Sequence, residues 1–141
     1  MAVTVTLEEL HDELGRVGHP TLRPVHGYAL NAVLNGYDTA SAMAPHLAMT
    51  KQGAARVISH LADEGYVTYG DGAGGDARRK PLLLTDRGRE VIELSVGIQE
   101  RIEQQWAEHA GPRATSMARK TLEKAVSRAG SDELPAVRLG W

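Results

Sequence analysis

One segment, MTKQGAARVISHLADEGYV at residues 49–67, constrains the fold most because it predicts a short helix with two different faces. At 3.6 residues per turn, the apolar side chains form one stripe suited to packing on a core: Ala54, Val57, Ile58 and Leu61. Hydrogen-bonding side chains lie on the opposite side: Gln52, Arg56 and Ser59. Thr50 is a suitable N-cap, and Lys51 lies in the first turn, where the helix dipole favours a phosphate. An ordinary amphipathic helix with a solvated polar face is the alternative interpretation.

Three further helices are expected before this segment. Apolar residues at helical spacing predict them over residues 7–17, 24–34 and 40–47. Pro24 suits a first helical turn, and Thr39 can cap the third helix, whose last turn Pro45 should loosen. In the second helix, Val33 or Leu34 is expected to be buried. The third helix, a tight turn and the two-faced helix together match the helix-turn-helix pattern.

A β-hairpin is predicted directly after the two-faced helix. Gly65 ends the helix, one strand follows from Tyr66, and a second strand is expected at residues 82–84. Between them, residues 70–80 read GDGAGGDARRK, a glycine-rich tip followed by three positive charges. The glycines also match a dinucleotide-phosphate pattern. That pattern requires a helix after the loop, and here a strand follows, which argues against nucleotide binding.

Two helices are expected at the C-terminal end of the chain. Thr85 can cap a long helix whose apolar residues repeat every three to four positions: Val91, Leu94 or Ser95, Ile98, Ile102 and Trp106. Gly111 and Pro112 break it, and a last helix is expected over residues 113–129, forming a helical hairpin with it. These helices exceed what a small domain needs for its own core, which suggests that they and the first helix pair with a second copy. An intramolecular bundle is the alternative.

The composition limits the classes of function. The chain has 141 residues and no cysteine, so it can build one core and has no disulfide, thiolate nucleophile or cysteine zinc site. No run of 18 apolar residues occurs, and we expect a cytoplasmic protein without membrane contact. The six histidines lack metal-ligand spacing and no serine lies in a nucleophile elbow, so neither an enzyme nor a cofactor or metal is expected. Because the net charge is −2, nucleic-acid binding would depend on local placement of basic residues.

Several motifs within about residues 20–110 complete the pattern. They are Leu22-Arg23-Pro24-x-His26-Gly27, Met49-Thr50-Lys51-Gln52, Leu61-x-x-x-Gly65-Tyr66-Val67, Asp76-x-Arg78 and Leu84-Thr85-x-x-Gly88. Together they resemble the MarR family of winged helix-turn-helix transcription regulators. The resemblance implies a mainly α fold with a small β-hairpin wing, in which a winged helix-turn-helix is joined to terminal dimerisation helices. It divides the chain into an N-terminal dimerisation helix (1–20), a DNA-binding domain (21–88), C-terminal dimerisation helices (89–130) and a tail (131–141).

The resemblance also implies a dimeric, sequence-specific regulator, most often a repressor, on a palindromic double-stranded DNA operator. The recognition helix would enter the major groove and the wing the minor groove, where Arg78 would be the wing arginine and Asp76 would position it or pair with a base. The implied DNA-binding residues are Thr50, Lys51, Gln52, Arg56, Ser59, Asp76, Arg78, Arg79 and Lys80. A winged-helix module that binds protein, without DNA or ligand, is the alternative.

MarR-like regulators commonly respond to a small aromatic or phenolic effector bound between the dimerisation helices and the winged domain. Carried over to this chain, the candidate ligand-binding residues are His11, His26 and Tyr28. Each of them is as readily explained as a core or boundary residue of its helix.

Overall fold

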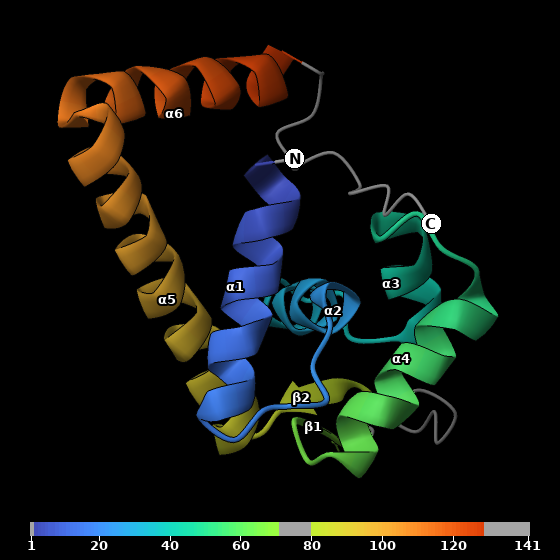
Figure 1. Cartoon of the computed structure of the whole chain (residues 1–141). Coiled ribbons are helices and arrows are strands. Elements are labelled where there is room, and N and C mark those ends of the chain that lie inside the picture. Colours follow the sequence, from blue (N-terminus) through green and yellow to red (C-terminus); the bar gives the residue numbers. More distant parts are fainter. Residues whose placement is uncertain (1, 71–79, 129–141) are drawn as a thin grey trace.

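The structure is a computed structural model that describes residues 2–70 and 80–128. The described residues form six helices and a two-stranded antiparallel sheet (Figure 1). Their order is α1 (Ala2–Arg16), α2 (Pro24–Leu34), α3 (Ala40–His46), α4 (Lys51–Asp63), β1 (Val67–Tyr69), β2 (Leu82–Leu84), α5 (Asp86–Ala110) and α6 (Pro112–Arg128). The mainly α fold with a small hairpin is confirmed, and α3, α4 and the hairpin follow one another as in a winged helix-turn-helix.

The boundaries of α2, α3 and α4 lie within two residues of the predicted ones, whereas α1 is longer than predicted. It begins at Ala2, and the expectation of a start at Leu7 was wrong. The residues between, VTVT, are β-branched and have low helix propensity, so the pattern gave no helical signal there. Each such residue costs well under about 1 kcal/mol, and extending a formed helix adds a hydrogen bond per residue.

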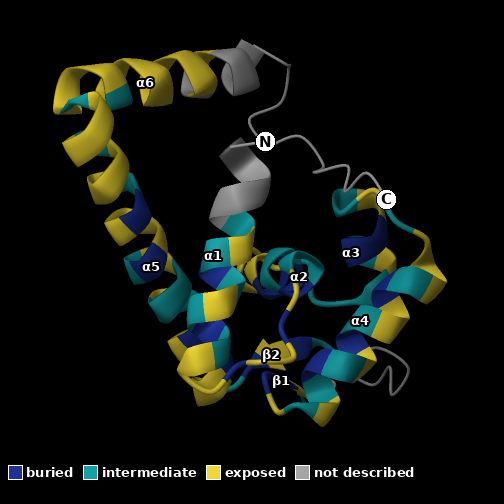
Figure 2. Cartoon of the chain, viewed as in Figure 1, coloured by how far each residue is buried: buried dark blue, intermediate teal, exposed yellow. Residues whose placement is uncertain are grey.

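The core lies where α1, α2, α3, α4, the hairpin and the part of α5 up to Ile102 meet (Figure 2). Its largest fully buried side chains are Tyr66, Leu14, Leu30, Met43, Leu61, Ile102 and Val91. In α2 the chain buries Val33 and leaves Leu34 59% exposed, which settles the alternative left open by the sequence. The predicted apolar stripe of α4 is confirmed, since Ala54, Ile58 and Leu61 are buried.

Thr85, the N-cap of α5, joins the short hairpin to that helix. β1 and β2 pair with Val67 opposite Leu84. Thr85 caps α5, because its hydroxyl accepts the Gly88 N–H at 3.1 Å and donates to the carbonyl oxygens of Gly65 and Tyr66 at 2.7 and 3.0 Å. A Cβ atom at position 88 would lie 2.2 Å from the Tyr66 oxygen. In the Leu-Thr-x-x-Gly motif the threonine therefore caps α5, and the glycine lets the backbone of α5 come close to that of Tyr66.

The two C-terminal helices form an open corner rather than a helical hairpin. α6 runs across the end of α5 in Figure 1 instead of back along it, so the predicted hairpin was wrong. Gly111 turns the chain with a φ of 88°, which glycine adopts without strain, and Glu103 and Arg119 form an ion pair inside the corner. α6 packs mainly against α5, not on the core as an intramolecular bundle would require. None of the described helices is long and apolar enough to cross a membrane.

Candidate nucleic-acid interface and cavity

The α4 helix presents its polar side chains outward. The Thr50 hydroxyl accepts the Gly53 N–H at 3.0 Å, so the predicted N-cap is confirmed. While the opposite side is buried in the core, the predicted contact residues of this helix are exposed: Thr50, Lys51, Gln52, Arg56 and Ser59. The Ser59 hydroxyl donates to the Asp63 carboxylate at 3.5 Å, so Ser59, like the cap residue Thr50, already has a partner on its own helix. Lys51, Gln52 and Arg56 are left as an outward polar face.

A hollow of about 340 Å³ joins α4 to the hairpin and to the start of α3. Lys51 from α4 and Lys80 from the arm before β2 both line it, together with Tyr69 and Ser41. Asp38 is the acidic residue in the same lining. Among the described residues, neither lysine makes an ion pair. The structure thus brings together two cations that are 29 positions apart in the sequence. Asp76, Arg78 and Arg79 lie outside the described residues.

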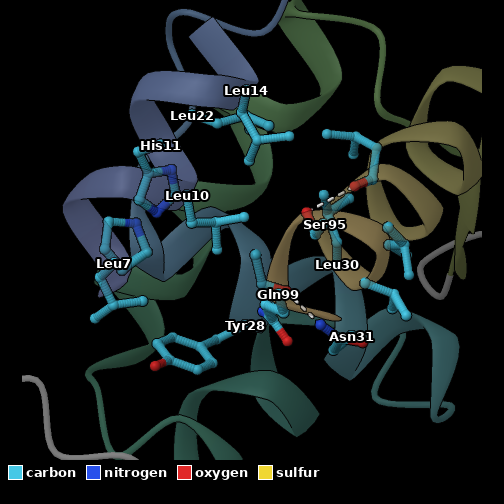
Figure 3. Close-up of a pocket in the computed structure, with 15 residues that line it drawn as sticks. Leu7, Leu10, His11, Leu14, Leu22, Tyr28, Leu30, Asn31, Ser95 and Gln99 are labelled. Atoms are coloured by element: carbon cyan, nitrogen blue, oxygen red, sulfur yellow. Dashed lines mark hydrogen bonds between the residues drawn. The ribbon is translucent and has the colours of Figure 1, made fainter. Parts of the chain in front are cut away.

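A second cavity, of about 220 Å³, lies between α1, α2 and α5 (Figure 3). Its walls are mostly aliphatic, and two of the three candidate ligand residues, His11 and Tyr28, line it. Both ring nitrogens of His11 are buried without a hydrogen-bond partner among the described residues. Burial, and secondly the charge of Arg23, lower the pKa of His11 below its usual 6.5. A neutral imidazole whose two nitrogens are buried therefore forms part of the wall of this apolar cavity.

His26, the third candidate, does not line this cavity. It is buried on the side of α2 that faces α4, where its ring stacks on that of His60 with centroids 4.3 Å apart and planes at 17°. Its Nδ1 accepts the Arg23 N–H at 3.0 Å. Burial lowers the pKa of His26 to about 4, with smaller contributions from the charges of His60, Arg23 and His11, against which Glu64 acts. The structure gives His26 a contact that sequence reasoning missed.

A further buried cluster ties the loop after α1 to β1 and α5. His19 Nδ1 lies 2.8 Å from the Tyr66 hydroxyl, which also accepts a hydrogen bond from Arg87 at 3.2 Å. Arg87 donates to the Gly18 carbonyl at 3.1 Å and lies 4.8 Å from the centre of the Tyr66 ring. Because the hydroxyl accepts from Arg87, its own hydrogen is free to bond a neutral His19. Burial, then Arg87, lowers the pKa of His19, with Glu90 opposing.

No protein-family model matches the chain, and no curated protein matches its sequence. Solved structures do match its fold. MepR, a transcription regulator of the Staphylococcus aureus multidrug efflux pump MepA, is 18% identical with a TM-score of 0.69, covering 92% of this chain and 94% of that one. A MepR mutant bound to an oligodeoxyribonucleotide is 18% identical over the same shares of both chains, with a TM-score of 0.66.

A MarR-family transcriptional regulator from Rhodococcus sp. RHA1 is more distant in sequence but similar in fold. It is 14% identical with a TM-score of 0.62, over 88% of this chain and 87% of that one. The likeness extends from α1 into the C-terminal helices, beyond the residues that carry the sequence motifs. This chain therefore has the winged helix-turn-helix fold of the MarR-family transcriptional regulators.

Proposed function

We propose that the chain is a cytoplasmic transcriptional repressor, and not an enzyme, that binds double-stranded DNA sequence-specifically as a homodimer. The observation that carries the proposal is the outward face of α4, where Lys51, Gln52 and Arg56 are exposed while the other face is held in the core. The oligodeoxyribonucleotide in the similarly folded MepR mutant supports the same use of the fold.

In this proposal α4 enters the major groove. Arg56 suits a bidentate contact with guanine and Gln52 one with adenine, each worth about 1–3 kcal/mol of discrimination. Lys51 and Lys80, which share one hollow, bind backbone phosphates and add affinity that depends on salt. Thr50 and Ser59 flank these contacts on the same exposed face.

The wing residues have their proposed roles from the sequence alone. Arg78 enters the minor groove, where a narrow groove enhances the negative potential, and Asp76 positions it. Arg79 binds phosphate beside Lys80. The winged domain corresponds to residues 21–88, residues 1–20 and 89–130 supply the dimerisation helices, and residues 131–141 are a tail.

The test begins with selection of bound duplexes from a random pool. We expect a palindrome with half-sites about one helical turn apart, as a symmetric dimer requires. Affinity is then measured by fluorescence anisotropy at several salt concentrations. Arg56→Ala should weaken binding and relax the sequence preference, and Arg78→Ala should weaken binding. Arg16→Ala, at an exposed arginine on the last turn of α1, is the control once light scattering shows that its mass equals that of the wild type, because α1 belongs to the proposed dimer interface. Unchanged affinity in both test variants would remove the DNA assignment, and transcription from a promoter carrying the selected site distinguishes repression from activation.

A protein-binding winged-helix module is the rival function. It predicts no steep fall of DNA affinity with salt, because no counterions would be released from DNA. It also gives no reason for Lys51 and Arg56 to share one exposed face. A flat salt dependence of weak binding would favour the rival.

The proposed dimer uses α1, α5 and α6. Around the corner between α5 and α6, an apolar groove of about 500 Å³ is lined by Trp106, Ala110 and Leu122, of which Trp106 is 44% and Leu122 66% exposed. Apolar side chains this exposed are typical of a surface that a partner covers. A second copy is the proposed occupant. Leu122→Lys should lower the mass measured by light scattering at micromolar concentration, while Leu34→Lys, at a leucine of similar exposure on α2, should not.

A small aromatic or phenolic effector is the proposed release signal. The site is the cavity lined by His11 and Tyr28. A ligand that displaces the side chains covering the imidazole would reach two ring nitrogens that have no hydrogen-bond partner among the described residues. His26 belongs to another contact and is not included. A panel of phenolic acids should release the selected duplex, and His11→Leu should abolish that release while DNA affinity without ligand persists. Silence across a broad panel would leave a constitutive DNA binder.

A further inference from the structure

Two histidines, buried His26 and half-buried His60, form a contact between α2 and the C-terminal half of α4. His26 lies in the first turn of α2 and His60 in the last turn of α4, and their rings stack with centroids 4.3 Å apart. His60 Nε2 is buried and has no hydrogen-bond partner among the described residues. The two imidazole rings are therefore in van der Waals contact, and the surroundings of His26 do not stabilise a positive charge on it.

The hydrogen bond of His26 fixes where its protons can be. Its Nδ1 accepts the Arg23 N–H at 3.0 Å, so the neutral ring carries its hydrogen on Nε2. A second proton would have to bind Nδ1, where it would meet the Arg23 N–H and break that bond. The charged ring would also lie against His60. Protonation therefore opposes both contacts that His26 makes.

Most of the charged or titratable groups around the His26–His60 contact shift the pKa of His26 in the same direction. Arg23 before α2, His11 on α1 and His60 on α4 all disfavour a positive His26, and they lower its pKa together with burial, which is the largest cause. Glu64, which ends α4 and accepts a hydrogen bond from Thr21 at 3.1 Å, is the opposing charge. A single carboxylate does not reverse the combined effect of burial, Arg23 and the two neighbouring imidazoles.

We propose that the His26–His60 stack is a proton-sensitive contact that holds α4 on α2, so that acidification loosens α4 and weakens DNA binding. The second half of this statement rests on the proposed function, whereas the first half concerns the fold alone. His60 lies one turn after Arg56 on the same helix. A change in how the end of α4 is held therefore alters the helix that carries the proposed base contacts.

The test is hydrogen exchange of the α4 amides at pH 7.5 and 5.0, with rates corrected for the intrinsic effect of pH. If opening frees His26 to its ordinary pKa of 6.5, the opening constant of α4 should rise about 25-fold between these pH values. In the double variant His26→Gln, His60→Gln the rise should shrink to a few-fold. His109→Gln, an exposed histidine on α5, should keep the wild-type rise.

A wild-type rise below about two-fold, or an equal rise in the double variant, overturns the proposal. If the double variant does not fold, NMR titration of the wild-type His26 imidazole decides instead, because α4 opening must follow the protonation of His26. Affinity for the selected duplex, at matched ionic strength, should fall with acid more steeply in the wild type than in the double variant. If no duplex binds at either pH, the proposed function fails, while the exchange result still decides the contact.

Discussion

Position 88 should accept glycine and nothing larger, and this can be tested within a single helix. Both Gly88 and Gly97 lie in α5, but a Cβ at 88 would be 2.2 Å from the Tyr66 carbonyl oxygen, whereas a Cβ at 97 would have no neighbour within 4 Å. Contacts of that kind below 3.0 Å do not occur, so Gly88→Ala must displace the backbone by about 0.8 Å. The Tyr66 oxygen accepts both the N–H and the hydroxyl of Thr85, and that displacement strains both bonds.

The expected magnitude follows from these contacts. Overpacking costs about 1–3 kcal/mol and each weakened hydrogen bond about 0.5–1.5 kcal/mol, while alanine returns about 1 kcal/mol of helix propensity. Gly88→Ala should therefore lower the free energy of unfolding by about 1–5 kcal/mol. Gly97→Ala receives the propensity gain without the clash and should raise it by about 0.5–1 kcal/mol.

Urea denaturation, followed by circular dichroism at several protein concentrations, measures both variants under conditions that also reveal any contribution from self-association. Equal stabilities for the two alanine variants would refute the close approach of α5 to Tyr66. A Gly88→Ala protein that unfolds at the wild-type urea concentration would do the same.

Three further outcomes are expected. Leu61→Ala, at a fully buried position of α4, should cost about 2–5 kcal/mol of stability in the same urea assay. Thr50→Ala removes the α4 cap and should cost about 1 kcal/mol, with Thr121→Ala on exposed α6 nearly neutral. The lowered pKa of His19 means that the folded state resists its protonation; stability is full above the unfolded-state value of 6.5 and is lost as the pH falls toward the lower folded-state value. His19→Gln should therefore flatten the fall of melting temperature from pH 7 to 5. A melting-temperature profile of the variant that runs parallel to that of the wild type would contradict the His19–Tyr66 contact.

Helix bounds were predicted correctly where the sequence carries a start or stop signal at the helix ends. Pro24 starts α2 and Asn35 and Gly36 end it, so its bounds were predicted correctly. The start of α1 carries no such signal, and packing rather than propensity decides that a helix forms there. The corner at Gly111 was predicted as a break, but the direction in which α6 leaves depends on tertiary contacts that periodicity does not contain.

The candidate interface was predictable to a similar extent. The period of α4 separates an inward from an outward face, and burial confirms the division at Ala54 and Arg56. The shared hollow of Lys51 and Lys80 and the stack of His26 on His60 join residues far apart in the sequence. No spacing rule connects such pairs, because their contact is created only when α2, α4 and the hairpin pack together.

The continuity of α5 has a geometric consequence. Its 25 residues make a rod about 37 Å long, anchored at one end beside the hairpin and meeting α6 at the other. A tilt of about 5° at the anchored end swings the far end by about 3 Å, which is comparable to the rise of two helical residues. If two copies are joined near that far end of α5, a modest rotation at the junction moves the two winged domains. The separation of their α4 helices then changes.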